Sequence, residues 1–191
     1  SKCSGRPVKM VNTRQDELTA SLPRVPMKIK MQLAVSKEGV FLGKKVKIIA
    51  DNGAYMNYGP GILLSAATRN DNLYKIKNIK TQGFLVYTNN MPTGAFRGFG
   101  CPQSHFAQET LIDEAAVKLG IDPAEIRLIN ASEKGDVTPH NWHLGSCGLC
   151  DCISQSVEAA EWKAKKKLYK KTKDKDDVWV KGIGIASCLH V

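Results

Sequence analysis

The chain has 191 residues, of which 42% are hydrophobic and 24% charged, a balance that suits one folded domain and excludes a wholly disordered chain. No apolar run approaches the roughly 20 residues that span a bilayer, and the N-terminus lacks the apolar core of a secretory signal. We therefore expect no membrane segment and a cytoplasmic protein. The net charge of +10 is local, because residues 163–177 hold eight lysines and three aspartates and supply half of it.

The cysteine count and the two ends of the chain add two expectations. Six cysteines are too few for a disulfide scaffold at this length, so reduced thiols are expected. The chain begins without methionine and ends in the apolar run VWVKGIGIASCLHV. We expect residues 1–191 to form a partial domain, truncated at both ends.

The first half of the chain predicts strands. Residues 27–35 have the two-residue period of a strand with one buried face, and residues 40–50 continue it after the turn at 36–39. This pattern predicts a long antiparallel hairpin. Residues 61–69 predict a short buried helix, and residues 83–88 predict a further strand.

The second half predicts helices. A helix is expected from Pro102 to Leu119, with an apolar stripe that turns polar in the first turn, at Ser104, His105 and Gln108. Asp122 is expected to cap the next helix, within a capping box closed by Glu125. We expect strands, a glycine-rich loop and two helices in residues 1–135, a loop in 136–147, and an amphipathic helix and final strand in 148–191. Strands followed by three or four helices indicate an α+β fold.

The stretch TGAFRGFGCPQ, residues 93–103, is the most informative motif. The motif predicts a strand, then a glycine-rich turn, then a helix that begins with proline. In such an arrangement the backbone N–H groups and the helix dipole point at one place, which favours the binding of an anion there. Arg97 adds a permanent cation, and Phe99 adds an aromatic wall. The structural alternative is a tight turn whose arginine pairs with a carboxylate and whose phenylalanines fill core. The motif alone leaves both interpretations open.

The wider sequence resembles a known family. The segments GRPVKMVNTRQDE, DNGAYMNYGPG, NLYKIKNI, VYTNNMPTGAFRGFGCPQSHFAQETLIDEAA, LGIDPAEIRLIN and KGD follow, in order and spacing, the molybdenum-binding region of the xanthine dehydrogenase and aldehyde oxidase family. The likeness covers essentially the whole chain. Within this family, the sequence most resembles the bacterial branch that includes hydroxybenzoyl-CoA reductase, nicotinate dehydrogenase and carbon monoxide dehydrogenase.

The resemblance implies a molybdopterin cofactor with molybdenum, in bacteria usually the cytosine dinucleotide form. Arg97 is implied to line the molybdenum centre and Phe99 to pack against substrate. The other implied cofactor-binding residues are Ala95, Phe96, Gly98, Gly100 and Gln103. The substrate would be an aldehyde, an N-heterocycle or an aromatic acyl-CoA. The family's catalytic glutamate lies outside these residues, so the isolated chain is expected to be inactive.

The resemblance also implies partners, namely the remaining molybdenum-domain segments and subunits or domains that carry FAD and two-iron two-sulfur clusters. The rival hypothesis is a non-catalytic module that binds an anion or nucleic acid through the glycine-rich loop and the lysine cluster at 163–175. We expect that cluster to be a solvated helix end, because only one aromatic residue lies among the lysines. We do not expect the cysteines and histidines of residues 140–152 to bind a metal, since their single C-x-x-C has no second pair.

Overall fold

The computed structural model describes residues 1–171 and 179–189. A three-stranded sheet forms its base, from β1 (Met27–Val35), β2 (Phe41–Gly53) and β3 (Asn78–Tyr87), in the order β1-β2-β3. The expected hairpin is confirmed, because β1 and β2 pair antiparallel from Met27↔Ala50 to Val35↔Phe41. β3 pairs parallel to β2 and begins at Asn78, five residues earlier than expected.

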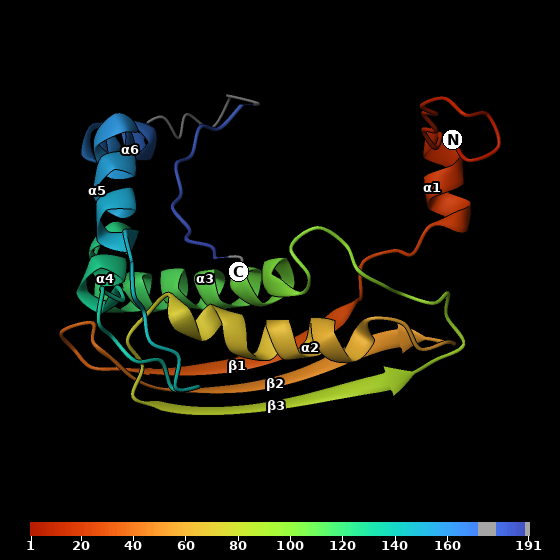
Figure 1. The fold of residues 1–191 in the computed structure, drawn as a ribbon. Helices are drawn as coiled ribbons and strands as arrows, with labels where there is room; N and C mark the ends of the chain where they lie inside the picture. Colours follow the sequence, from red (N-terminus) through yellow and green to blue (C-terminus); the bar gives the residue numbers. More distant parts are fainter. Residues whose placement is uncertain (172–178, 190–191) are drawn as a thin grey trace.

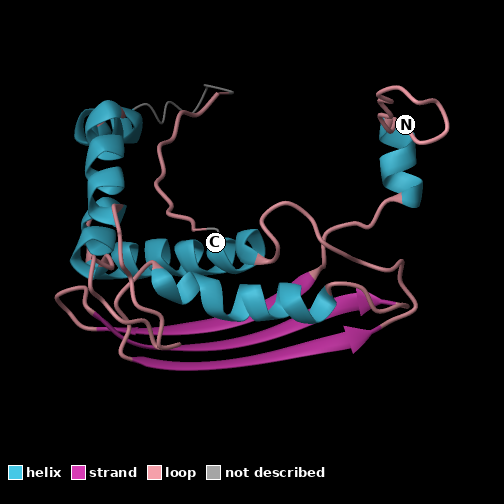
Figure 2. Ribbon diagram, in the orientation of Figure 1, coloured by secondary structure: helices cyan, strands magenta, loops and turns pink. Residues whose placement is uncertain are grey.

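Two helices cover one face of this sheet. They are α2 (Gly59–Thr68), which connects β2 to β3 through a short 3-10 helix at Arg69–Asn72, and α3 (Cys101–Leu119). Figures 1 and 2 show both helices on the same side and no helix on the opposite side. The α+β fold is therefore confirmed, with a sheet that is open on one face.

Buried and exposed residues alternate along β2, and this alternation explains where the core lies. Val46, Ile48 and Ala50 are at most 3% exposed and pack beneath α2, against residues that include Ile62 and Ala66. A second core cluster joins the other end of the sheet to α3 and α4 (Pro123–Asn130). Its buried members are Phe41, Leu73, Tyr74, Ile76, Ile112, Ala116 and Ile126.

The C-terminal part differs from the sequence-based expectation. In place of one amphipathic helix, the chain forms α5 (Leu149–Ala159) and α6 (Trp162–Lys171), separated at Glu161, whose φ is +51°. The break places the buried Trp162 where its indole N–H donates to the Asp122 carboxylate. Asp122 also accepts from the Ala124 amide, as an N-cap does, so its side chain joins α4 to α6.

The expected final strand is also absent from the described residues. Residues 179–189 run without strand pairing, because they lie on the helix side of the sheet: Ile183 and Ile185 pack against Ile153 and Trp162, and the segment ends beside α3 (Figure 1). The described residues hold six α-helices, which is more than the three or four expected. The helix not yet described is α1 (Arg14–Ala20), which has no buried residue and projects from the rest of the structure.

Candidate functional site

The glycine-rich stretch forms a tight turn at the N-terminus of α3. Gly98, Phe99 and Gly100 all have positive φ, at +93°, +45° and +94°. A Cβ at Gly100 would lie 2.4 Å from the Ile62 carbonyl oxygen, so α2 packs directly on the loop backbone. Only glycine combines this φ with this contact at low cost. The turn is therefore a fixed part of the fold.

Arg24, which precedes β1, holds the turn from outside. Its guanidinium donates to the Arg97 carbonyl at 2.7 Å and to Gln103 Oε1 at 3.4 Å, and lies 4.5 Å from the centre of the Phe96 ring. Gln103 Nε2 donates to the Val25 carbonyl at 2.9 Å. Sequence analysis missed Arg24, since it lies 73 residues before Arg97 and belongs to no local motif.

The backbone amides of the turn are largely used within it. The Phe99 N–H donates to the Phe96 carbonyl at 2.8 Å, the Cys101 N–H donates to the Gly98 carbonyl at 2.9 Å, and Pro102 has no N–H. The helix start therefore offers fewer free donors to an anion than the motif suggests. The positive charge of Arg97 becomes the main feature that favours an anion.

The side chains named from the sequence separate into two groups. Ala95, Phe96 and Arg97 are exposed, and Arg97 forms no ion pair with any residue in 1–171 or 179–189. Phe99 is half-buried, packs with Val25, Ala50 and Ile62, and meets Tyr58 edge to face at 6.3 Å. The interpretation in which the arginine is neutralised by a carboxylate is therefore wrong for the described chain, whereas Phe99 does contribute to the core.

A surface groove of about 620 Å³ runs from the turn along α3. Arg97 and Gly98 lie at one end, Cys101, His105 and Phe106 lie along the helix, and residues 186–189 form the facing wall. Phe99, Gly100 and Gln103 do not line this groove. The fold thus presents Arg97 to the groove, while Gly100 and Gln103 shape the turn that carries it.

The polar first turn of α3 is buried, as expected. Ser104, His105 and Gln108 are at most 5% exposed, and Lys44 Nζ donates to Gln108 Oε1 at 2.7 Å. Lys44 also pairs with the buried Asp71. Burial lowers the pKa of His105 to about 4, and the nearby Lys44 charge adds to this shift. His105 Nε2 has no hydrogen-bond partner among the described residues.

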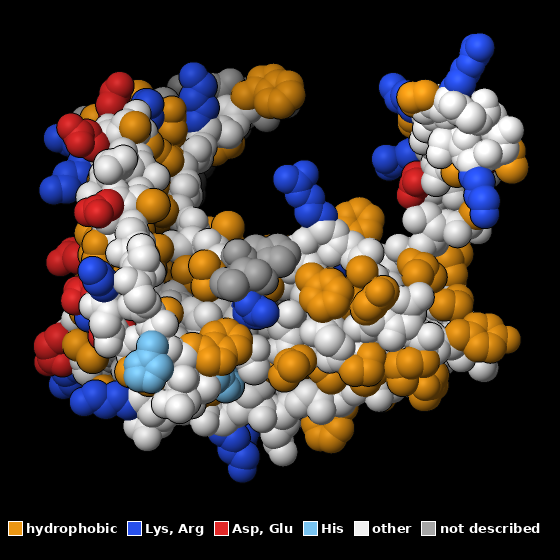
Figure 3. Space-filling model, viewed as in Figure 1, with side chains coloured by type: hydrophobic (Ala, Val, Ile, Leu, Met, Phe, Trp, Pro, Cys, Tyr) orange, Lys and Arg blue, Asp and Glu red, His pale blue; other side chains and the backbone are white. Residues whose placement is uncertain are grey.

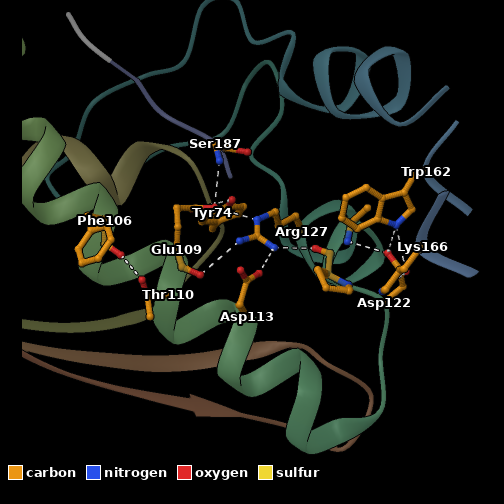
Figure 4. Close-up of polar contacts among 12 residues, drawn as sticks. Tyr74, Phe106, Glu109, Thr110, Asp113, Asp122, Arg127, Trp162, Lys166 and Ser187 are labelled. Atoms are coloured by element: carbon orange, nitrogen blue, oxygen red, sulfur yellow. Dashed lines mark hydrogen bonds and ion pairs between the residues drawn. The ribbon is translucent and has the colours of Figure 1, made fainter. Parts of the chain in front are cut away.

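Farther along α3, a buried ionic network joins this helix to three other parts of the chain (Figure 4). Arg127 of α4 is fully buried, and its Nε donates to Glu109 Oε2 at 2.8 Å. The Tyr74 hydroxyl donates to Glu109 Oε1 at 2.9 Å, and the Ser187 amide donates to Glu109 Oε2 at 3.0 Å. Burial, followed by the Glu109 charge, raises the pKa of Tyr74. Glu109 is thus a structural carboxylate that fixes one wall of the groove.

The lysine cluster lies elsewhere. Its described part is on α6, at the end of the molecule away from the turn at residues 96–100 (Figure 1), and residues 172–175 lie outside the described residues. The glycine-rich loop and the described part of the lysine cluster are therefore not on one surface. No helix in the described residues is long and apolar enough to cross a membrane. Those residues also hold no group of three metal-ligating side chains.

Comparison with known proteins identifies the family. Residues 1–131 match the molybdopterin cofactor-binding domain. The chain is 37% identical over 191 residues to a probable xanthine dehydrogenase subunit of Bacillus subtilis, covering 98% of the chain and 24% of that protein. It is 35% identical over 156 residues to the nicotinate dehydrogenase large molybdopterin subunit of Eubacterium barkeri, covering 81% of the chain and 37% of that protein.

Solved structures agree with these relatives. The aldehyde oxidoreductase from Desulfovibrio gigas superposes with a TM-score of 0.77 at 33% identity, over 84% of this chain and 17% of that one. The chain therefore spans well under half the length of the relatives it matches. The match supports the molybdopterin hypothesis and gives no support to the non-catalytic binding module. The chain belongs to the molybdopterin cofactor-binding domain family of the xanthine dehydrogenase and aldehyde oxidoreductase group.

Proposed function

We propose that this chain forms one wall of the molybdopterin site of a larger molybdenum-dependent hydroxylase or dehydrogenase, with Arg97 as its main anion-binding residue. One observation carries the proposal: among the described residues, Arg97 is a cation without an ion-pair partner, on a turn held rigid by Arg24 and α2 at the end of a groove. An unpaired cation on a fixed backbone fits a cofactor that carries phosphate and oxo groups.

Each residue of the turn has a distinct part in this proposal. Arg97 binds and orients the anionic group, since its planar guanidinium offers several donors without losing its charge. Ala95 and Phe96 line the exposed side, and the exposed edge of Phe99 contacts substrate. Gly98, Gly100 and Gln103 hold the backbone in place. The cofactor, when bound, supplies the redox chemistry of hydroxylation.

The rest of the enzyme is also part of the proposal. The general-base glutamate lies outside this chain, so residues 1–191 act as a partial domain that is inactive alone. We propose the cytosine dinucleotide form of the cofactor, partners with FAD and two-iron two-sulfur clusters, and an aldehyde, N-heterocycle or aromatic acyl-CoA as substrate. The names of the related nicotinate dehydrogenase and aldehyde oxidoreductase support the N-heterocycle and the aldehyde. A cytoplasmic location is supported by six cysteines that are all unpaired.

The test is the molybdenum and pterin content of the intact enzyme that contains this chain, with Arg97→Ala compared with Arg14→Ala. Both arginines are exposed, but only Arg97 lies at the turn. We expect Arg97→Ala to weaken cofactor retention about tenfold to hundredfold, the effect of losing a hydrogen bond to a charged group. Equal molybdenum in the two folded variants would contradict the role of Arg97.

A further inference from the structure

The face of the sheet that no helix covers carries five lysines. In the strand register, one row of neighbours contains Lys30, Lys47 and Gln82, and the next contains Gln32, Lys45 and Lys80. Lys28 lies in the preceding row, beside Ile49 and Phe84. The five lysines are exposed and point away from α2 and α3. We call Lys28, Lys30, Lys45, Lys47 and Lys80 the lysine face.

These charges are close together and uncompensated. Lys30 lies directly opposite Lys47, and Lys45 lies directly opposite Lys80. Adjacent strands are about 4.8 Å apart, and residues of one strand on the same face are about 6.8 Å apart. Like charges placed directly opposite each other destabilise a sheet. None of the five lysines forms an ion pair within the part of the chain that the structure describes.

The three strands contain one acidic residue, Asp51. Asp51 lies at the end of β2, but its carboxylate accepts hydrogen bonds from Thr88, Asn90 and the Gly53 amide. The acidic side chains visible in Figure 3 gather mainly over the end formed by α4, α5 and α6. The strands therefore supply no free carboxylate to the lysine face, which leaves its charges to solvent ions or to a partner.

The sheet surface is also hollowed beside these lysines. Ala34 and Gly43 are neighbours in the strand register, and their small size leaves a depression of about 600 Å³. Lys45, Lys77 and Lys80 line it. A depression lined by three lysines suits a projecting carboxylate, which can accept charge-assisted hydrogen bonds from their ammonium groups.

We propose that the lysine face docks an acidic protein surface, supplied by another polypeptide segment of the larger enzyme and inserting a carboxylate between Lys45, Lys77 and Lys80. Charge complementarity carries the proposal, and two observations favour protein over nucleic acid. The three strands contain no arginine, and the ring of Phe84 is covered by Lys47 Nζ at 5.2 Å, so it offers no open stacking platform. The proposal goes beyond the cofactor site and does not depend on its occupancy.

Zero-length carbodiimide cross-linking of the intact enzyme tests the proposal, because it joins lysine amines only to carboxylates in contact with them. We expect Lys45, Lys77 or Lys80 to link to Asp or Glu of another segment. We also expect the lysine face to resist acetylation, while Lys163 and Lys167, two exposed lysines of α6, react freely. Neither readout depends on molybdenum content, so failure here is distinct from failure of the cofactor proposal.

A second experiment compares the double variant Lys30→Gln/Lys47→Gln with a control double variant on α6, Lys163→Gln/Lys167→Gln. The first should reduce the cross-link yield at Lys45 and Lys80 about fivefold, the effect of one or two exposed ion pairs, and the second should leave it unchanged. Free acetylation of the lysine face in the intact enzyme would overturn the proposal. So would protection that nuclease removes, which would indicate nucleic acid, or cross-links only to a second copy of this chain.

Discussion

Two arginines lie beside helix α3, and they are used in opposite ways. Arg127, which packs beside the middle of α3, is fully buried and has Glu109 and Asp113 as partners at 2.8 Å. Arg97, just before the helix begins, is exposed and unpaired within the described residues, although its backbone is firmly held. A buried charge must be neutralised within the fold, whereas a fixed charge left without a partner is available to a ligand.

The largest effect is expected from removing the buried arginine. Arg127→Met leaves Glu109 buried without its cation, and we expect the free energy of unfolding to fall by about 3–5 kcal/mol. Urea denaturation compared with Arg14→Met, an exposed arginine, measures this. A loss below about 1 kcal/mol would show that the network is solvated, and Arg127 would then not differ from Arg97 in its contribution to stability.

The next effect is a pH dependence that arises at His105. Its pKa is 6.5 when unfolded and about 4 in the fold, so between these values only the unfolded chain binds the proton. Stability is therefore complete above pH 6.5 and falls by about 3 kcal/mol as the pH drops towards 4. Denaturation of wild type and His105→Leu at pH 7 and pH 4 measures the difference. Equal pH dependence in the two proteins would contradict the assignment.

A smaller effect is expected at the turn itself. Gly100 and Gly135 share a φ of +94°, but a Cβ meets the Ile62 carbonyl at 2.4 Å only at Gly100, while Gly135 faces open space. Strain at a positive φ costs about 1–3 kcal/mol, so both alanine variants lose stability. Gly100→Ala should lose more and also displace the turn. Thermal unfolding of the two variants isolates the packing contribution, and equal losses would show that α2 does not confine the turn.

The smallest effect on stability belongs to Arg97→Met. An exposed side chain with no ion pair among the described residues should change the free energy of unfolding by less than about 0.5 kcal/mol. Measured under the same conditions as Arg127→Met, this variant completes the comparison between the two arginines. A loss of several kcal/mol would mean that Arg97 holds the fold together, and its availability to a cofactor would then be in doubt.

Local patterns were enough to predict the hairpin, helix α3 and the burial of its polar first turn. A two-residue period places Val46 and Ile48 inside, and a helical period that ends at Gly120 places Ile112 inside. The family resemblance then identified the motif around Arg97. Neighbours within a few residues determine the hairpin and α3, whereas the resemblance depends on segments along the whole chain.

The features that were missed depend on contacts distant in sequence. Arg24 reaches Arg97 across 73 residues, and Glu109 receives the Ser187 amide across 78 residues. The break between α5 and α6 follows from the contact of Trp162 with Asp122, 40 residues earlier. The final strand was predicted from apolar alternation, but a strand also needs a free sheet edge beside it, and sequence periodicity does not reveal that edge.

The hydrogen bond from the Ser187 amide to Glu109 determines the order in which the two walls of the groove form during synthesis. Residues 186–189 form one wall of the groove and are the last described residues to leave the ribosome. Domains begin to fold from the N-terminal side during synthesis, so the sheet, α3 and the Arg127 pair can form while this wall is still missing. The groove beside Arg97 therefore gains its second wall only when the Ser187 amide docks on Glu109, after α3 and α4 are in place.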